Sequence, residues 1–173
     1  MDTTVIAIVR LVHVLSGVFW VGSVLMLTLF LVPAVRALGS VGEAVMHQLM
    51  VVQRLARGLR VTGGFSIGSG ALLYWHDSDG FTRAWVGSHQ GICFGIGGIL
   101  AVSGALVGIL VNRPTAERIG VVAVAISEAG GPPRAELVAE LQALHARLAV
   151  GAVATSTLLV GAASAMAVAR YLV

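Results

Sequence analysis

Two histidines stand in apolar stretches of the sequence, where a side chain able to bind a metal is unusual. His13 lies within RLVHVLSGVFWVGSVLMLTLFLVP, residues 10–33, and His89 lies near the start of a second apolar stretch that begins at Trp85. A polar group without a partner in hydrocarbon costs several kcal/mol, so each histidine needs a hydrogen bond, a charge or a metal. Neutral imidazole is a common ligand of haem iron, and two imidazoles can fill both axial positions.

The positions of the two histidines predict that they reach similar depths. His13 lies about eight residues into its expected helix, or roughly 12 Å, and His89 lies about four residues into another. Facing helices of a bundle commonly hold such sites. We therefore expect His13 and His89 to be axial ligands of a haem b. The alternative is that each histidine hydrogen-bonds a backbone carbonyl or a serine on a neighbouring helix.

Residues near His13 fit a flat, bulky ligand. Ser16 and Gly17 follow on the same helical face and leave room beside the imidazole. Arg10, one turn earlier, would pair with a haem propionate or extend to lipid headgroups. Trp20 lies two turns further along the same face.

A second pair of histidines, His47 and His145, occurs early in two amphipathic segments at comparable height. The sequence predicts a second haem or a metal there, with ordinary interfacial histidines as the alternative.

Carboxylates are absent from the middle of every apolar stretch. Proton pumps and cation-coupled transporters usually place an acid at mid-depth, so the sequence argues against ion transport. The eight acids lie at segment ends or in loops: Asp2, Glu43, Asp77, Asp79, Glu117, Glu128, Glu136 and Glu140.

The composition is that of a helical membrane protein. Of 173 residues, 57% are hydrophobic and 11% are charged, with a mean hydropathy of +0.94. A soluble domain has about 25% charged residues. The first apolar run is too long for a signal peptide and is expected to be retained. The single cysteine, Cys93, excludes an internal disulfide, a cysteine-cage zinc site and a C-x-x-C-H haem attachment.

The apolar runs predict one all-α domain over residues 1–173. We expect an integral membrane antiparallel four-helix bundle with long helices that protrude into the cytoplasm. Pro33 and the Gly39–Gly42 turn are expected to end the first span, and Asn112-Arg113-Pro114 is expected to end the third. A short interfacial helix is expected over residues 115–131. The four spans are expected at about 5–35, 43–76, 85–111 and 134–172.

Glycine-rich stretches in the second and third spans have two interpretations. They would leave a slot for a porphyrin, or they would be small-xxx-small motifs for helix packing, as in Gly64-x3-Gly68.

The arginines, the only strongly basic residues, predict the orientation. Three lie on the side of the N-terminus, called here the N-terminal side: Arg10, Arg83 and Arg170. Eight lie on the other, the arginine-rich side: Arg36, Arg54, Arg57, Arg60, Arg113, Arg118, Arg134 and Arg147. Positive residues concentrate in the cytoplasm, so we expect an inner-membrane protein with both termini outside and no nucleic-acid partner.

The string His13-x6-Trp20-x-Gly22 resembles the first helix of a superfamily of small membrane proteins that includes CopD-like copper-resistance proteins and HemJ-like protoporphyrinogen oxidases. That resemblance covers about 100 residues and implies a haem b bound through His13. The third helix of the family often opens with tryptophan and has lysine four residues later; here Trp85 is followed by His89.

The replacement of that lysine by a second potential iron ligand favours an electron-transfer haem over protoporphyrinogen oxidation. Copper handling is disfavoured by scattered methionines and a lone cysteine, since Cu(I) prefers soft ligands. Expected partners are the lipid bilayer and other redox subunits or a second copy of the chain.

Overall fold

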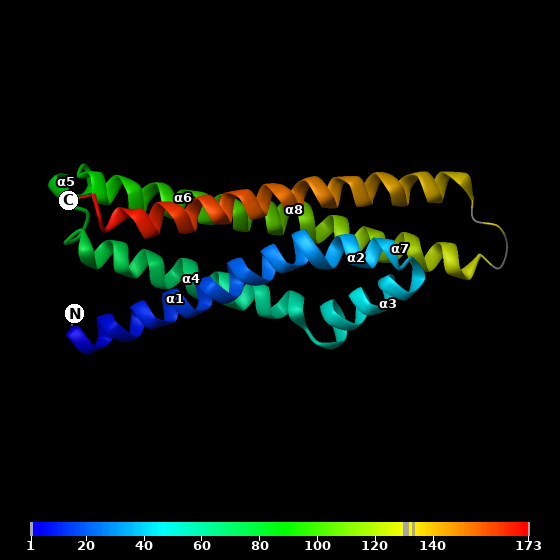
Figure 1. Cartoon of the computed structure of the whole chain (residues 1–173), viewed down its shortest axis with the longest axis horizontal. Coiled ribbons are helices and arrows are strands. Elements are labelled where there is room, and N and C mark those ends of the chain that lie inside the picture. Colours follow the sequence, from blue (N-terminus) through cyan, green and yellow to red (C-terminus); the bar gives the residue numbers. More distant parts are fainter. Residues whose placement is uncertain (1, 130–131, 133, 173) are drawn as a thin grey trace.

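The computed structural model describes residues 2–129, 132 and 134–172. The described residues form helices joined by short turns, with no strand among them (Figure 1), so the all-α prediction is confirmed. The elements are α1 (Thr3–Met26), the π-helix η1 (Leu27–Leu31), α2 (Val32–Ala37), α3 (Ser40–His47), the π-helix η2 (Gln48–Val52), α4 (Leu55–Asp77), α5 (Arg83–Val86), α6 (His89–Val107), the π-helix η3 (Gly108–Asn112), α7 (Arg113–Glu128) and α8 (Ala135–Ala169).

The long helices pack mainly as two antiparallel pairs, α1 with α4 and α6 with α8. Figure 1 shows the start of α1, the end of α8 and the α4–α5 connection at one end of the molecule, and the end of α7 and the start of α8 at the other. Contacts of α1 with α8 and of α4 with α6 join the two pairs. Within the described part of the chain, no Cα atom of α1 lies within 8 Å of one in α6.

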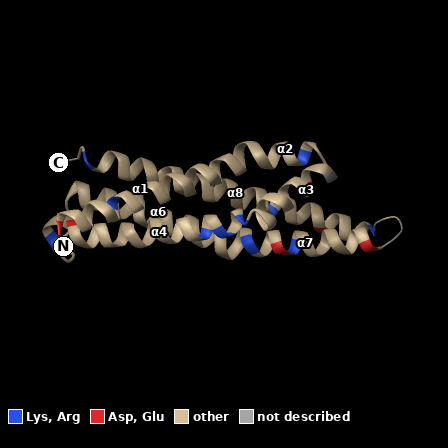
Figure 2. Cartoon of the chain, turned by 90° about the horizontal axis from the view of Figure 1, so that it is seen from below, with Lys and Arg blue, Asp and Glu red and all other residues tan. Residues whose placement is uncertain are grey.

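Three continuous helices are long and apolar enough to cross a membrane: Thr3–Ala37, His89–Glu128 and Ala135–Ala169. Figure 2 shows long uncharged stretches between the charged residues near the chain ends and those of α2 and α7. At 1.5 Å per residue, α4 is about 35 Å long, and its stretch without charged or histidine side chains, residues 61–75, is about 22 Å long. It is less apolar than the other three, because it carries Arg57, Arg60, His76 and Asp77 and is rich in glycine and serine.

Both prolines expected to end a span lie inside continuous helices, so that part of the expectation was wrong. The first helix does end at Ala37, just before the expected turn at Gly39. Pro33 is in the first turn of α2 and Pro114 in the first turn of α7, and each follows a π-helix directly. A helix turn that has switched to i→i+5 bonding accommodates the proline ring and its missing N–H. The short helix expected over residues 115–131 is present up to Glu128 but is not a separate helix, and residues 130 and 131 lie outside the described part of the chain. Residues 113–128 continue the third apolar helix and pack along α8, with Val122 only 2% exposed.

The expected second span, residues 43–76, is two helices. Arg54 has φ +56°, the left-handed region, and separates η2 from α4. The preceding helix α3 folds back on α2. This packing is close because the Val35 carbonyl oxygen occupies the place where a Cβ on Gly42 would lie. The amphipathic segment is therefore not an extension of α4.

Among the described residues, two hydrogen bonds between uncharged side chains join the three apolar helices. Asn112 Nδ2 donates to Thr155 Oγ1 over 3.0 Å and joins η3 to α8, and Ser156 Oγ donates to Thr28 Oγ1 over 3.0 Å and joins α8 to η1's first turn. Asn112 Oδ1 is buried and accepts no conventional hydrogen bond from the described residues. It faces the Cα of Gly151, which places a Cα–H donor against it.

Replacing Thr155 with valine tests the Asn112 contact. The change keeps the side chain's shape and removes the hydroxyl that accepts from Asn112, so we expect a loss of about 1 kcal/mol in unfolding free energy. Thr157→Val is the matched control, because its hydroxyl bonds only the Val153 carbonyl of its own helix. Chemical denaturation in detergent measures both. Equal losses in the two variants would contradict an interhelical role.

Candidate functional site

The imidazole of His13 is held against α4 by a backbone carbonyl. Its Nδ1 lies 2.8 Å from the carbonyl oxygen of Ser66 and 3.5 Å from Ser69 Oγ. A carbonyl only accepts, so Nδ1 carries the proton and donates it. The other ring nitrogen, Nε2, then carries the lone pair, and it makes no hydrogen bond to any described residue. The hydrogen bond from His13 to a backbone carbonyl on a neighbouring helix is the alternative to haem ligation expected from the sequence, and the structure confirms it for His13. The same tautomer leaves Nε2 able to bind a metal.

Small residues on α4 let the bulky residues of α1 approach. A Cβ added to Gly70 would lie 2.8 Å from Cε1 of His13, and one added to Gly63 would lie 3.0 Å from the indole of Trp20. Between them, a Cβ added to Gly17 of α1 would lie 3.2 Å from Oγ of Ser66. Trp20 is buried, at 7% exposure, and His13 is half-buried. The two helices therefore interlock, with large residues of α1 seated over glycines of α4.

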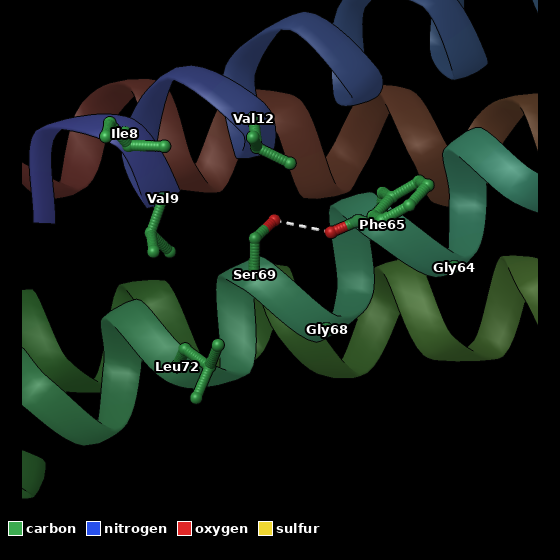
Figure 3. A pocket seen from close by; sticks show the side chains of 8 residues that line it. All are labelled: Ile8, Val9, Val12, Gly64, Phe65, Gly68, Ser69 and Leu72. Carbon is green, nitrogen blue, oxygen red and sulfur yellow. Dashed lines mark hydrogen bonds between the residues drawn. The ribbon is translucent and has the colours of Figure 1, made fainter. Parts of the chain in front are cut away.

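Figure 3 shows an apolar groove between α1 and α4, with a volume of about 290 Å³. Gly64 and Gly68 line it, and neither has an atom within 4 Å of where its Cβ would be. The packing interpretation therefore fails for Gly64-x3-Gly68 within the described part of the chain. It holds for Gly104 of Gly104-x3-Gly108, where a Cβ would lie 3.2 Å from Leu159 of α8. The groove is lined by Ile8, Val9, Val12, Gly64, Phe65, Gly68, Ser69 and Leu72.

The second expected ligand, His89, is not in contact with His13. It is the exposed first residue of α6, rather than about four residues inside a helix, because Ser88 caps α6 by accepting from the Gly91 N–H over 3.1 Å. Tyr74 Oη donates to the Gly91 carbonyl over 3.2 Å and fixes this end of α6 against α4.

The other residues near His13 have local partners. Arg10 pairs with Asp77 of α4, with an N–O distance of 3.5 Å, and Asp77 also lies 3.3 Å from Nδ1 of His76. Ser16 donates to the Val12 carbonyl one turn earlier. Arg10 and Ser16 thus contribute to helix pairing and to the helix surface, and neither contacts the His13 imidazole through its side chain.

The structure does not bring His47 and His145 together. His47 is exposed at the end of α3 and His145 is half-buried on α8, and no described Cα atoms of α3 and α8 lie within 8 Å. Arg36 donates to the main-chain carbonyl of His145 over 3.0 Å. The described residues contain no cluster of three or more histidine, cysteine or acidic side chains suited to a metal ion.

The sequence reasoning missed the residues on α4 that receive His13: Gly63, Ser66, Ser69 and Gly70. One signal was available. His13 and Trp20 are seven residues apart, as are Gly63 and Gly70, and this two-turn spacing places each pair on one helical face.

No family model, curated protein or solved structure matches this chain. Its function must therefore be inferred from the geometry around His13.

Proposed function

We propose that the protein is a membrane-embedded b-type haem protein in which Nε2 of His13 is an axial ligand of the iron. The observation that carries this proposal is the hydrogen bond from His13 Nδ1 to the Ser66 carbonyl. It fixes the ring and leaves Nε2 without a partner among the described residues. We further propose that α4 crosses the membrane with the three apolar helices, that the membrane is the inner one, and that both termini lie outside.

Ser66 and its neighbours would set the orientation of the His13 imidazole as a ligand. A backbone carbonyl that accepts from Nδ1 orients the imidazole and raises the basicity of Nε2. The surroundings are apolar, and the nearest acid in contact with this region, Asp77, is paired with Arg10. Apolar surroundings with few carboxylates suit the hydrophobic porphyrin of a haem. When bound, haem supplies one-electron chemistry, which makes electron transfer with a partner redox subunit the favoured role.

The structure fits one axial position better than two. His89 remains the sequence's candidate for the second ligand, but it lies exposed at the start of α6. A reduced-minus-oxidised spectrum of the purified protein tests the assignment. A sharp low-spin b-type α-band that His89→Ala removes supports ligation by both histidines. A high-spin spectrum that His89→Ala leaves unchanged would mean that His13 is the only histidine ligand of the iron. The absence of any b-type signal would contradict the proposal.

A second candidate, oxidation of a porphyrinogen as in HemJ-like proteins, is favoured by the same separation of His13 from His89. A haem held by one histidine keeps an open coordination position, which an enzyme needs and an electron carrier does not. Rescue of a strain that lacks protoporphyrinogen oxidase would support this function. Failure of rescue by well-expressed protein would count against it.

A further inference from the structure

A second groove lies between α8 and the part of the third apolar helix around η3. It has a volume of about 460 Å³ and, apart from one arginine, only apolar side chains and a glycine line it. The lining residues are Val107, Val111, Ala146, Arg147, Val150, Gly151 and Ala154. An apolar groove on a helix pair within a bilayer is covered by acyl chains or by another helix.

Arg147 stands where the apolar part of α8 begins. The residues from Leu148 to Val168 carry no charge and span about 32 Å at 1.5 Å per residue, which matches the hydrocarbon thickness. The guanidinium of Arg147 therefore lies at headgroup level, and the groove runs from it past Val150 and Ala154 into the hydrocarbon region.

Two carboxylates near this end of the molecule are already paired with other arginines. Glu117 accepts from Arg113 over 2.8 Å and Glu140 accepts from Arg118 over 2.7 Å. The hydrogen bond with Glu140 also raises the pKa of Arg118 above its ordinary value. Arg147 is exposed and forms no ion pair with any residue that the structure describes. Its planar fork of donors suits a phosphate group.

We propose that this groove binds a phospholipid with an anionic headgroup, with one acyl chain along Val107, Val150 and Ala154 and the phosphate on Arg147. Charge complementarity selects this occupant over a neutral helix, because a helix would bury the guanidinium against apolar side chains. The groove between α1 and α4 has no cation in its lining and offers no such selection. The inference does not depend on haem binding.

Native mass spectrometry of the full chain, released from mixed micelles of phosphatidylglycerol and phosphatidylcholine with identical chains, tests the proposal. Wild-type protein should retain about fivefold more phosphatidylglycerol than phosphatidylcholine. This is the ratio expected for the roughly 1 kcal/mol that one arginine contributes at an anionic surface. Arg147→Gln should abolish the preference while both lipids still bind. Ala154→Phe, which fills the groove, should reduce retention of both lipids. Gly68→Leu, which fills the α1–α4 groove, should leave the preference unchanged.

Arg118→Gln is the matched control, because it removes an exposed arginine of the same end that is paired with Glu140. It should leave the lipid preference as in wild type. An equal loss of preference in Arg118→Gln and Arg147→Gln would mean that general surface charge causes the preference, and it would contradict a specific lipid site at Arg147. So would an unchanged preference in Arg147→Gln, or displacement of the lipid by millimolar glycerol phosphate. Circular dichroism of each variant confirms that it is folded.

Discussion

Replacing His13 with alanine should remove most of the bound haem, lowering the haem-to-protein ratio at least tenfold in protein purified from the same membranes. The imidazole is the proposed ligand, and its hydrogen bond to the Ser66 carbonyl holds the ring in place. Alanine would leave the iron without this ligand. Absorbance of the Soret band per chain measures the effect. Added imidazole should restore part of the absorbance, because the truncated side chain leaves space beside Gly70 for the free ligand.

His76→Ala is the control for this experiment. His76 lies on α4 near the same end and contacts Asp77, yet it is outside the His13 site. Its haem content should equal that of wild type. Full haem content in His13→Ala, or an equal loss in both variants, would contradict ligation by His13.

Replacing Gly70 with alanine should disturb the same site without touching the ligand. The new Cβ would lie 2.8 Å from Cε1 of His13, so the ring must move and its hydrogen bond to Ser66 must lengthen. Loss of such a supporting contact typically weakens metal binding 10- to 100-fold. Overpacking also costs about 1–3 kcal/mol of stability, more than the roughly 1 kcal/mol that alanine gains in helix propensity.

Gly68→Ala supplies the matched comparison, because no atom lies within 4 Å of where its Cβ would be. This variant should bind haem as wild type does and unfold at the same or a slightly higher temperature. Haem titration and thermal unfolding in detergent measure the two variants side by side. If Gly70→Ala binds haem as tightly as Gly68→Ala, the close packing of the His13 imidazole against Gly70 has no role in haem binding.

The sequence was sufficient to predict the helical class and three of the long apolar helices, since uninterrupted apolar runs leave few alternatives. It failed where local rules compete with packing. Pro33 and Pro114 are ordinary helix terminators, but a π-helical turn before each one lets the helix continue. Arg54 lies in an amphipathic run typical of a helix, yet it takes a left-handed conformation, and α3 folds back on α2.

The contacts of His13 and Trp20 could be predicted only in part, because they too depend on how the helices pack. His13 and Trp20 were identified because their types are unusual in an apolar helix. Their actual neighbours, Gly63, Ser66 and Gly70, could not be assigned without the register of α1 against α4, because glycines occur on both faces of α4. The depth assigned to His89 also depended on where its helix begins, and the cap at Ser88 moved that start to His89 itself.

The haem-to-protein ratio of the purified wild-type chain tests the central assignment most directly. Pyridine haemochrome absorbance, together with protein quantified by amino-acid analysis, gives this ratio without any assumption about axial ligands. The bond from His13 Nδ1 to Ser66 and the unpartnered Nε2 predict about one haem b per folded chain. A fully helical protein that is colourless, and that stays colourless when haemin is supplied, would contradict haem binding.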